Sequence, residues 1–435
     1  MSLCVNISIA IVVMVNNYVS SPGISGFNQT HSNFTSQHNL KQDKVYDWSP
    51  DTQGWILSAF YYGYSVFQIA SGFVADRVGG KLLVGGGVLG SAVPTLLIPL
   101  AADLGASYVI ALRVLAGLVE SSILPAISAV WSEWAPTLER SRLLGIVYSG
   151  MYFGIFISLP ISGAICYHVG WAYSFYIIGA CGVVWSLLWF WIASDRPETH
   201  RSISAAEREY IIASLRGQVS PHEGDIPWLS IMKSAAVWAI IISYWGCDTF
   251  HYFLTTMLPT YMEEILRFDI QQTGLSSSIP FIASWLLVIF GGELADYLIK
   301  SQNFSTLAVR KGCIVSGLWI SGIFIAVTGY VEDYKLTVAF VTISTATSAI
   351  SESAIYVNCL DLTLKYSGII FGITNTISIT PGMLWPVIVK HVTQNHTIEE
   401  WRTVFGVIAA LNVLCSLIYA IFGKAETQPW AAEEN

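Results

Sequence analysis

The stretch RVLAGLVESSILPAISAVWSEWAPTLERSR, from Arg113 to Arg142, decides how the rest of the chain is interpreted. It begins as an apolar helix, yet it carries Arg113 and Glu120 within that helix. Their spacing is almost two α-helical turns, about 10.5 Å along the axis, so both side chains point to one side. A charge at the bilayer centre costs roughly 2.5–3.5 kcal/mol, so such residues usually face a partner or a water-filled cavity. The stretch therefore predicts a membrane helix that lines a cavity.

The composition indicates a membrane protein. Hydrophobic residues make up 54% of the chain, charged residues only 11%, and the mean hydropathy is +0.57. A soluble domain usually carries about 25% charged residues. The seven cysteines show no paired loop spacing, so we expect neither a disulfide framework nor a metal site. The net charge of -8 gives no reason to expect a nucleic-acid partner.

Apolar runs long enough to cross a bilayer recur along the whole length, which predicts an all-α polytopic membrane protein with about 12 transmembrane helices. The first run, 1–15, spans only about 22 Å as a helix and looks like the second half of a truncated first span. The other spans are expected near 52–75, 82–101, 107–132, 143–165, 172–193, 232–257, 273–298, 312–330, 336–357, 367–389 and 402–422.

A polar stretch divides the chain into two halves. We expect an N-terminal six-helix half at 1–193 with an extracytoplasmic loop at 17–51, a cytoplasmic central loop at 194–230, a C-terminal six-helix half at 231–423 and a cytoplasmic tail at 424–435. Most lysines and arginines then fall in loops on the cytoplasmic side, as the positive-inside rule requires. Arg310 is expected in one of these loops, and Lys390 in a loop on the other side. The sequons at Asn28, Asn33 and Asn395 lie on the other side, which makes them predicted glycosylation sites.

Several motifs carry a family resemblance. GFVADRVGGK, from Gly72 to Lys81, resembles the loop signature of the major facilitator superfamily, and GELAD at Gly292 is a weak echo of it in the second half. Longer stretches resemble the family that contains sialin, the vesicular glutamate transporters and the type I sodium–phosphate cotransporters. These are TQGWIL at Thr52, YYGY at Tyr61, WAPTLERSRLL at Trp134, LPTYMEEILRF at Leu258, GITNT at Gly372 and PGM at Pro381. The resemblance covers nearly the whole chain.

The resemblance implies a major facilitator fold and secondary active transport of small organic anions or phosphate. The partners it implies are an anionic substrate, a coupling ion (H⁺ or Na⁺) and the lipid bilayer, with no cofactor and a monomeric protein. A lysosomal or vesicular membrane and the plasma membrane both remain open. We find no GxSxG, HExxH or Walker sequence, which argues against an enzyme and against ATP-driven pumping.

The resemblance also implies site residues. The residues that match family motifs are Arg113 and Glu120 in the fourth helix, Tyr62 and Tyr64 in the second, Asn6 in the first and Asn375 in the eleventh. Two interpretations of the fourth-helix pair stay open. The pair either holds helices together or couples transport, with Glu120 taking up a proton.

Other candidates follow from the residues themselves. Tyr61 and Tyr64 share a helix face, and both packing and substrate contact remain open for them. His251, with Asp248 one turn earlier, is either a structural histidine or part of a proton relay. Charged residues at the helix ends are expected to form conformational latches: Asp76, Arg77, Glu139, Arg140 and Asp296.

The chain departs from its relatives at polar positions. Cys4 stands where relatives carry an arginine, and Ser128 and Cys359 stand where they carry histidines; Asp248 and Glu352 replace neutral polar residues. These changes make the cavity less positive, which predicts weak or absent sialic acid and glutamate transport and allows a weakly acidic, neutral or cationic substrate. The alternative is a non-transporting relative that acts as a membrane sensor or partner.

Overall fold

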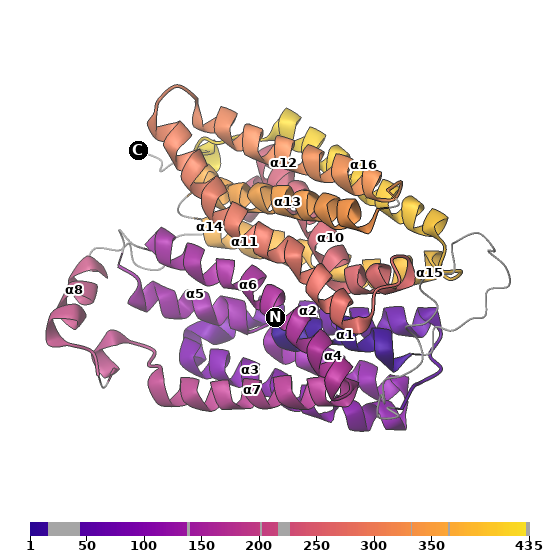
Figure 1. The fold of residues 1–435 in the computed structure, drawn as a ribbon. Helices are drawn as coiled ribbons and strands as arrows, with labels where there is room; N and C mark the ends of the chain where they lie inside the picture. Colours follow the sequence, from indigo (N-terminus) through magenta and orange to yellow (C-terminus); the bar gives the residue numbers. More distant parts are fainter. Residues whose placement is uncertain are drawn as a thin grey trace.

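The computed structural model describes residues 1–15, 44–136, 140–200, 202–215, 227–331, 333–363 and 366–431. Its helices form two groups, one before and one after the short helix α8, and the groups lie against each other like two stacked layers (Figure 1). We call the end of the bundle near α8 the α8 end, and the end where α15 joins α16 the far end.

The first group contains α1 (Ser2–Met14), α2 (Pro50–Val78), α3 (Gly80–Leu104), α4 (Ala106–Glu120), α5 (Ile123–Trp134), α6 (Arg140–His168) and α7 (Trp171–Ile192). Two short helices, α8 (Ala205–Leu215) and α9 (Trp228–Lys233), follow in the connection. The second group contains α10 (Ala235–Glu264), α11 (Ile270–Lys300), α12 (Thr306–Thr328), α13 (Tyr334–Leu362), α14 (Ser367–Ser378), α15 (Thr380–Val392) and α16 (Ile398–Phe422).

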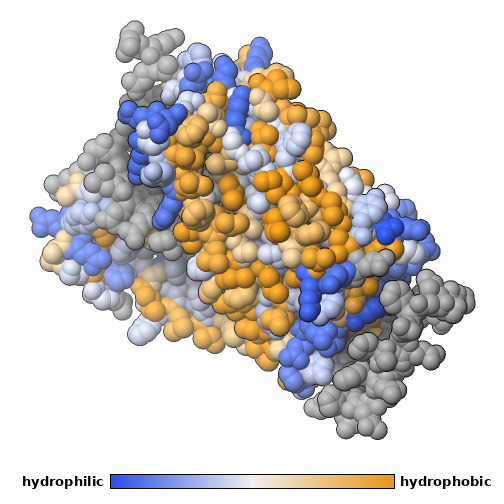
Figure 2. All heavy atoms as spheres, turned by 45° about the horizontal axis from the view of Figure 1, so that its top comes forward, coloured by the Kyte–Doolittle hydropathy of each residue, from blue (hydrophilic) through white to orange (hydrophobic). Residues whose placement is uncertain are grey.

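Among the residues that the structure describes, eight helical segments are long and apolar enough to cross a membrane. The outer surface carries a broad band of hydrophobic residues, and hydrophilic residues gather on either side of that band (Figure 2). Apolar side chains on the surface of a soluble protein would be costly to hydrate, whereas lipid tails solvate them. The all-α, multi-pass membrane architecture expected from the sequence is therefore confirmed.

Two of the expected spans are each split into two helices. The fourth span breaks at Ser121 and Ser122, between α4 and α5, because Pro125 has no N–H to donate to Ser121 and its ring crowds that carbonyl. The hydroxyls of Ser121 and Ser122 donate instead to the carbonyls of Leu118 and Val119, at 2.7 and 2.9 Å. The eleventh span breaks in the same way at Ile379, just before Pro381.

The two groups meet most closely through glycines in the far half of the bundle. The Cα atom of Gly274 in α11 lies 3.2 Å from the position that a Cβ atom on Gly163 of α6 would take. A Cβ atom on Gly54 of α2 would lie 2.9 Å from the carbonyl oxygen of Pro386 in α15. Only glycine allows backbones to approach this far, so these two crossings fix how the groups pack.

A similar crossing inside the first group gives a testable prediction. A Cβ atom on Gly117 of α4 would lie 1.9 Å from the carbonyl oxygen of Phe60 in α2, whereas one on Gly86 of α3 would meet nothing within 4 Å. We expect Gly117→Ala to destabilise the protein by about 1–3 kcal/mol because the two helices must separate. Gly86→Ala should be neutral or slightly stabilising, since alanine favours the helix. Thermal unfolding in detergent compares the two, and equal melting temperatures would refute the prediction.

Candidate functional site

Arg113 is buried between α1, α2 and α4, with 2% of its surface exposed. One terminal nitrogen, Nη1, donates to the carbonyl oxygen of Cys4 at 3.2 Å, and the guanidinium lies 5.1 Å above the centre of the Phe60 ring. Its Nε has no hydrogen-bond partner in the part of the chain that the structure describes. An arginine offers five donors, so this buried cation keeps most of its capacity to bind an anion.

Glu120 does not neutralise Arg113. Its Oε2 accepts a hydrogen bond from the Ser91 hydroxyl in α3 at 2.7 Å, and its Oε1 lies 3.5 Å from the amino group of Met1. The two charges therefore sit almost two turns apart on α4 and contact different neighbours. The two side chains therefore do not form an ion pair with each other: Arg113 binds a backbone carbonyl of α1, and Glu120 contacts Ser91 and Met1. Both interpretations of the pair, helix packing and coupling, stay predictions.

The tyrosines of α2 divide between two faces. Tyr61 is 4% exposed; its hydroxyl lies 3.9 Å from the sulfur of Cys4, and its ring packs edge-on against Tyr252 of α10 at 4.9 Å. Tyr64 packs over Phe60, the ring that lies below Arg113. Tyr62 instead contacts Trp55, on another face of α2. Tyr61 and Tyr64 thus belong to the surroundings of Arg113, and Tyr61 links the two helix groups.

Two acidic side chains face this region from the second group. Asp248 of α10 is 4% exposed and lies within electrostatic range of Glu352 in α13 and of the Ser378 hydroxyl in α14. Glu352 accepts a hydrogen bond from the hydroxyl of Tyr152, which belongs to α6 in the first group. The Tyr356 hydroxyl also binds Glu352. We call Asp248, Glu352, Tyr152 and Tyr356 the carboxyl cluster.

Aromatic rings surround the carboxyl cluster. The hydroxyls of Tyr244 and Tyr356 are hydrogen-bonded, and both rings contact Phe371. His251 contacts the rings of Tyr152 and Tyr252, each at 5.6 Å between centres. Asp248, one turn before His251, binds the Ser378 hydroxyl and lies within electrostatic range of Glu352. The surroundings of His251 are aromatic, as expected for a histidine that packs between helices.

The remaining candidates from the resemblance lie elsewhere in the helices. Asn6 is fully buried, and its Oδ1 accepts a hydrogen bond from Ser174 of α7, inside the first helix group. Asn375 lies in α14, half-buried, three residues before Ser378. Asn375 is on the same helix as Ser378, which binds Asp248 of the carboxyl cluster.

Other predictions fall outside the described residues. The glycosylation candidates Asn28 and Asn33 and the latch residue Glu139 lie there, as do the side chains of Asp76, Arg77, Arg140, Asp296 and Ser128. Asn395 is described: it is exposed in the turn before α16, and its amide donates to Glu400 at 2.6 Å. Its glycosylation stays a prediction.

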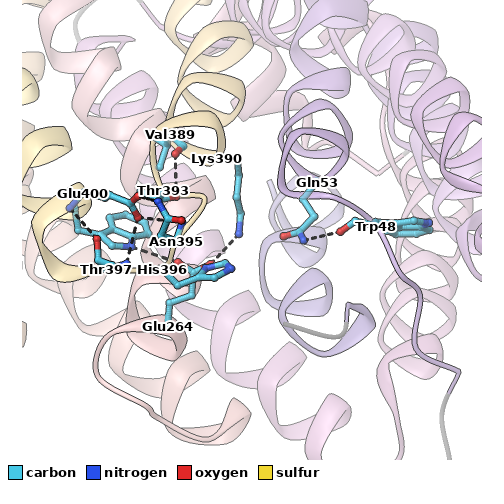
Figure 3. A network of polar contacts seen from close by, with 11 residues as sticks. Trp48, Gln53, Glu264, Val389, Lys390, Thr393, Asn395, His396, Thr397 and Glu400 are labelled. Carbon is cyan, nitrogen blue, oxygen red and sulfur yellow. Dashed lines mark hydrogen bonds and ion pairs between the residues drawn. The ribbon is translucent and has the colours of Figure 1, made fainter. Parts of the chain in front are cut away.

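The far end contains a buried ionic network that the sequence did not lead us to expect (Figure 3). Lys390 of α15, assigned to a loop from the sequence, is 1% exposed and donates to Glu264 Oε1 at 2.9 Å. His396 Nδ1 lies 3.0 Å from the same oxygen, and the Trp401 indole donates to the other at 3.3 Å. We call Glu264, Lys390 and His396 the far-end triad. It joins the end of α10 to the end of α15 and the start of α16.

A second buried pair lies at the α8 end, where the sequence also suggested a loop charge. Arg310 of α12 donates to Asp361 of α13 at 2.8 Å, and Asn358 donates to the carbonyl of Lys424 at 2.9 Å. Cys359, between them in sequence, is buried in the hydrophobic core of the second group. Cys359 stands where relatives carry a histidine. This difference therefore alters the packed region at the α8 end and not the surroundings of Arg113.

Sequence reasoning missed several members of these sites. Tyr152 and Tyr356 gave no signal beyond being tyrosines in apolar spans. Glu264 and Lys390 had one usable signal: each stands close to the end of a long apolar run, where a charge needs a partner if its helix end is covered. The pairing of these charges depends on tertiary packing, so it could not be deduced from the sequence.

Comparisons with known proteins agree with this architecture. Residues 7–386 match the model of the Major Facilitator Superfamily. Human sialin is 46% identical over 100% of this chain and 88% of its own length. The human "Probable small intestine urate exporter" is 36% identical over 99% of this chain and 88% of its own length. Human vesicular glutamate transporter 2 is 33% identical over 99% of this chain and 72% of its own length.

Solved structures show the same fold. A bacterial homologue of the human lysosomal transporter Spinster, in an inward-facing and occupied conformation, superimposes with a TM-score of 0.70 at 14% identity, covering 98% of this chain and 97% of that one. A D-xylose–proton symporter gives a TM-score of 0.68 at 13% identity with the same coverage. The chain therefore belongs to the major facilitator superfamily, in the branch that contains sialin and the vesicular glutamate transporters.

Proposed function

We propose that the protein is a secondary active transporter of small organic anions that works by alternating access and is coupled to H⁺ or Na⁺. Its relatives are named for sialin, urate export and vesicular glutamate transport. Two of these names refer to organic anions, urate and glutamate, and the shared family supports the same class of cargo here.

The buried Arg113 is the observation that carries the proposal. Its guanidinium is 2% exposed, and among the described residues its Nε has no hydrogen-bond partner and the side chain forms no ion pair, which is costly in a membrane helix. A substrate carboxylate bound to the planar guanidinium offsets this cost through paired, charge-assisted hydrogen bonds. Glu120, on the same helix, is the proposed acceptor of a coupling proton.

Contacts between the two helix groups supply the conformational coupling. Tyr61 packs against Tyr252, and Tyr152 donates to Glu352, so each contact joins one group to the other beside a buried charge. A ligand bound at this level competes with these contacts or strengthens them, which biases the groups between two arrangements. The far-end crossings hold one side closed while the ligand exchanges at the other.

The test is transport by the purified full chain in proteoliposomes. We expect counterflow of a labelled organic anion from a panel of sialic acid, urate, glutamate and lactate, with uptake that responds to an imposed pH or sodium gradient. Imposed voltage then reports the net charge carried. Thermal stabilisation by an anion without any counterflow would instead support a sensor, and would refute the proposal.

A further inference from the structure

The charges of the candidate site are distributed unequally between the two helix groups. The first group contributes Arg113, and the second contributes Asp248 and Glu352. An anion transporter needs the arginine, but two carboxyl groups beside an anion path oppose its binding by like-charge repulsion. The presence of these two carboxyl groups therefore indicates a ligand that carries a positive charge as well as a negative one.

Basic side chains of the second group are engaged elsewhere. Arg310 binds Asp361 and Lys390 binds Glu264, and both of these pairs are buried at the ends of the bundle. Within the described ranges, Asp248 binds the Ser378 hydroxyl and lies within electrostatic range of Glu352, Tyr244 and Tyr252. Glu352 binds the hydroxyls of Tyr152 and Tyr356. Two carboxylates in a low-dielectric site repel each other, and a cation placed between them relieves that repulsion.

The rings around the two acids suit an ammonium group. Tyr244 and Tyr356 pack at 5.3 Å between ring centres, and Tyr356 and Phe371 at 5.1 Å. The rings of Tyr152 and Tyr252 both contact His251, which lies one helical turn from Asp248. Aromatic faces attract alkylammonium ions more strongly when water is excluded, and protein sites for such ions combine rings with carboxylates.

Arg113 provides a second and independent indication of a ligand. Its Nε has no partner among the residues described, although the side chain is 2% exposed. A chain of three contacts leads from Arg113 toward the acids. Arg113 binds the Cys4 carbonyl, the Cys4 sulfur contacts the Tyr61 hydroxyl, and the Tyr61 ring packs on Tyr252. Tyr252 is in turn within electrostatic range of Asp248. Opposite charges thus lie on the two sides of one tyrosine–tyrosine contact.

We propose that this site binds a small zwitterion, an amino carboxylate whose carboxylate is held by Arg113 and whose ammonium group is held between Asp248 and Glu352. This inference rests on the proposed transport function and narrows its substrate class. A ligand of this kind bridges the two helix groups with one charge on each. A plain carboxylate engages only the first group.

Matched ligand pairs test the proposal on the unmodified protein. Glycine, β-alanine, 4-aminobutyrate and 5-aminovalerate are each compared with the acid of equal chain length that lacks the amino group. Binding is measured from the ligand-dependent shift in melting temperature of the purified full chain. We expect at least one chain length at which the zwitterion binds about 10-fold more tightly or better than its partner. Equal affinity within every pair would overturn the proposal.

Variants then locate the ammonium group. Asp248→Asn and Glu352→Gln should each weaken zwitterion binding about 10-fold. Neither variant should weaken binding of the matched acid, because each removes a negative charge that repels the acid. Glu399→Gln, an exposed acid in the first turn of α16, is the matched control and should change neither. If Asp248→Asn and Glu352→Gln both still bind the zwitterion more tightly than the matched acid, as the wild type does, these residues do not hold the ammonium group and the proposal fails. Strong binding of choline, with no requirement for a carboxylate, would also overturn it in favour of a cation site.

Failure of this inference is distinct from failure of the transport function. Counterflow of an anion such as lactate, with no preference for any zwitterion, would leave anion transport in place and remove the ammonium subsite. Absence of counterflow for every anion and every zwitterion in the panel would refute both.

Discussion

Replacing Arg113 with glutamine is expected to reduce transport of carboxylate substrates about 100-fold, and replacing it with lysine about 10-fold. A charge-assisted hydrogen bond contributes about 1.5–3 kcal/mol, and each 1.4 kcal/mol is a factor of ten. Glutamine removes the charge as well as the paired donors. Lysine keeps the charge but lacks the planar fork that matches a carboxylate. Initial rates of uptake into proteoliposomes, at equal protein incorporation, measure the effect.

Arg402 offers a control with similar contacts. Its Nε donates to the carbonyl of Gly329 at 2.7 Å, and its guanidinium lies 5.0 Å from the centre of the Tyr330 ring. Arg113 likewise binds a backbone carbonyl and a ring, so the two substitutions remove comparable structural contacts. Arg402→Gln should therefore retain transport. Equal losses in the two variants would mean that Arg113 matters only for folding, and the assignment of Arg113 as the anion-binding group would be wrong.

The largest effect on stability is expected at Lys390. Lys390→Met leaves Glu264 as a buried carboxylate that has lost the lysine of the far-end triad, and breaking a buried ion pair costs about 3–5 kcal/mol. Methionine fills nearly the same volume as the lysine stem, so the loss reports the charge and not a cavity. Thermal or chemical unfolding in detergent measures it.

Two further variants separate the charge from the packing. Lys335→Met, at an exposed position in the first turn of α13, should change stability by no more than about 0.5 kcal/mol. The double variant Lys390→Met/Glu264→Leu removes both charges and should recover much of the loss, because an apolar replacement of a buried pair is often neutral. A double variant no more stable than Lys390→Met alone would show that the far-end triad stabilises through its geometry, including the bond from Trp401, and not through its charge balance.

The sequence was sufficient for the helical architecture and insufficient for the pairing of its charges. Apolar runs of span length leave few alternatives in a bilayer, where every backbone group must be bonded within its own segment, so the helices were predicted close to their observed positions. The breaks at Ser121 and Ile379 were predictable in principle, since Pro125 and Pro381 follow them, but we assigned unbroken spans.

Pairing of charges depends on contacts between distant segments. Arg113 and Glu120 share a face of α4, yet one binds α1 and the other α3. Lys390 and Arg310 were assigned to loops because basic residues near span ends usually lie there. Their carboxylate partners, Glu264 and Asp361, are more than fifty residues away in sequence or in another helix, and no local pattern identifies them.

The glycine crossings at the far end have a mechanical consequence. α6 and α11 touch at Gly163 and Gly274, near one extremity of helices that are 29 and 31 residues long, or about 43 and 46 Å. A fulcrum at one extremity makes each helix a lever: a tilt of about 10° displaces a point ~30 Å away by ~5 Å while the contact itself barely moves. The side-chain volume at Gly163 and Gly274 therefore determines how far the opposite ends of α6 and α11 can move. Changes as small as one methyl group there should alter the range of motion of the whole transporter more than larger changes in its middle.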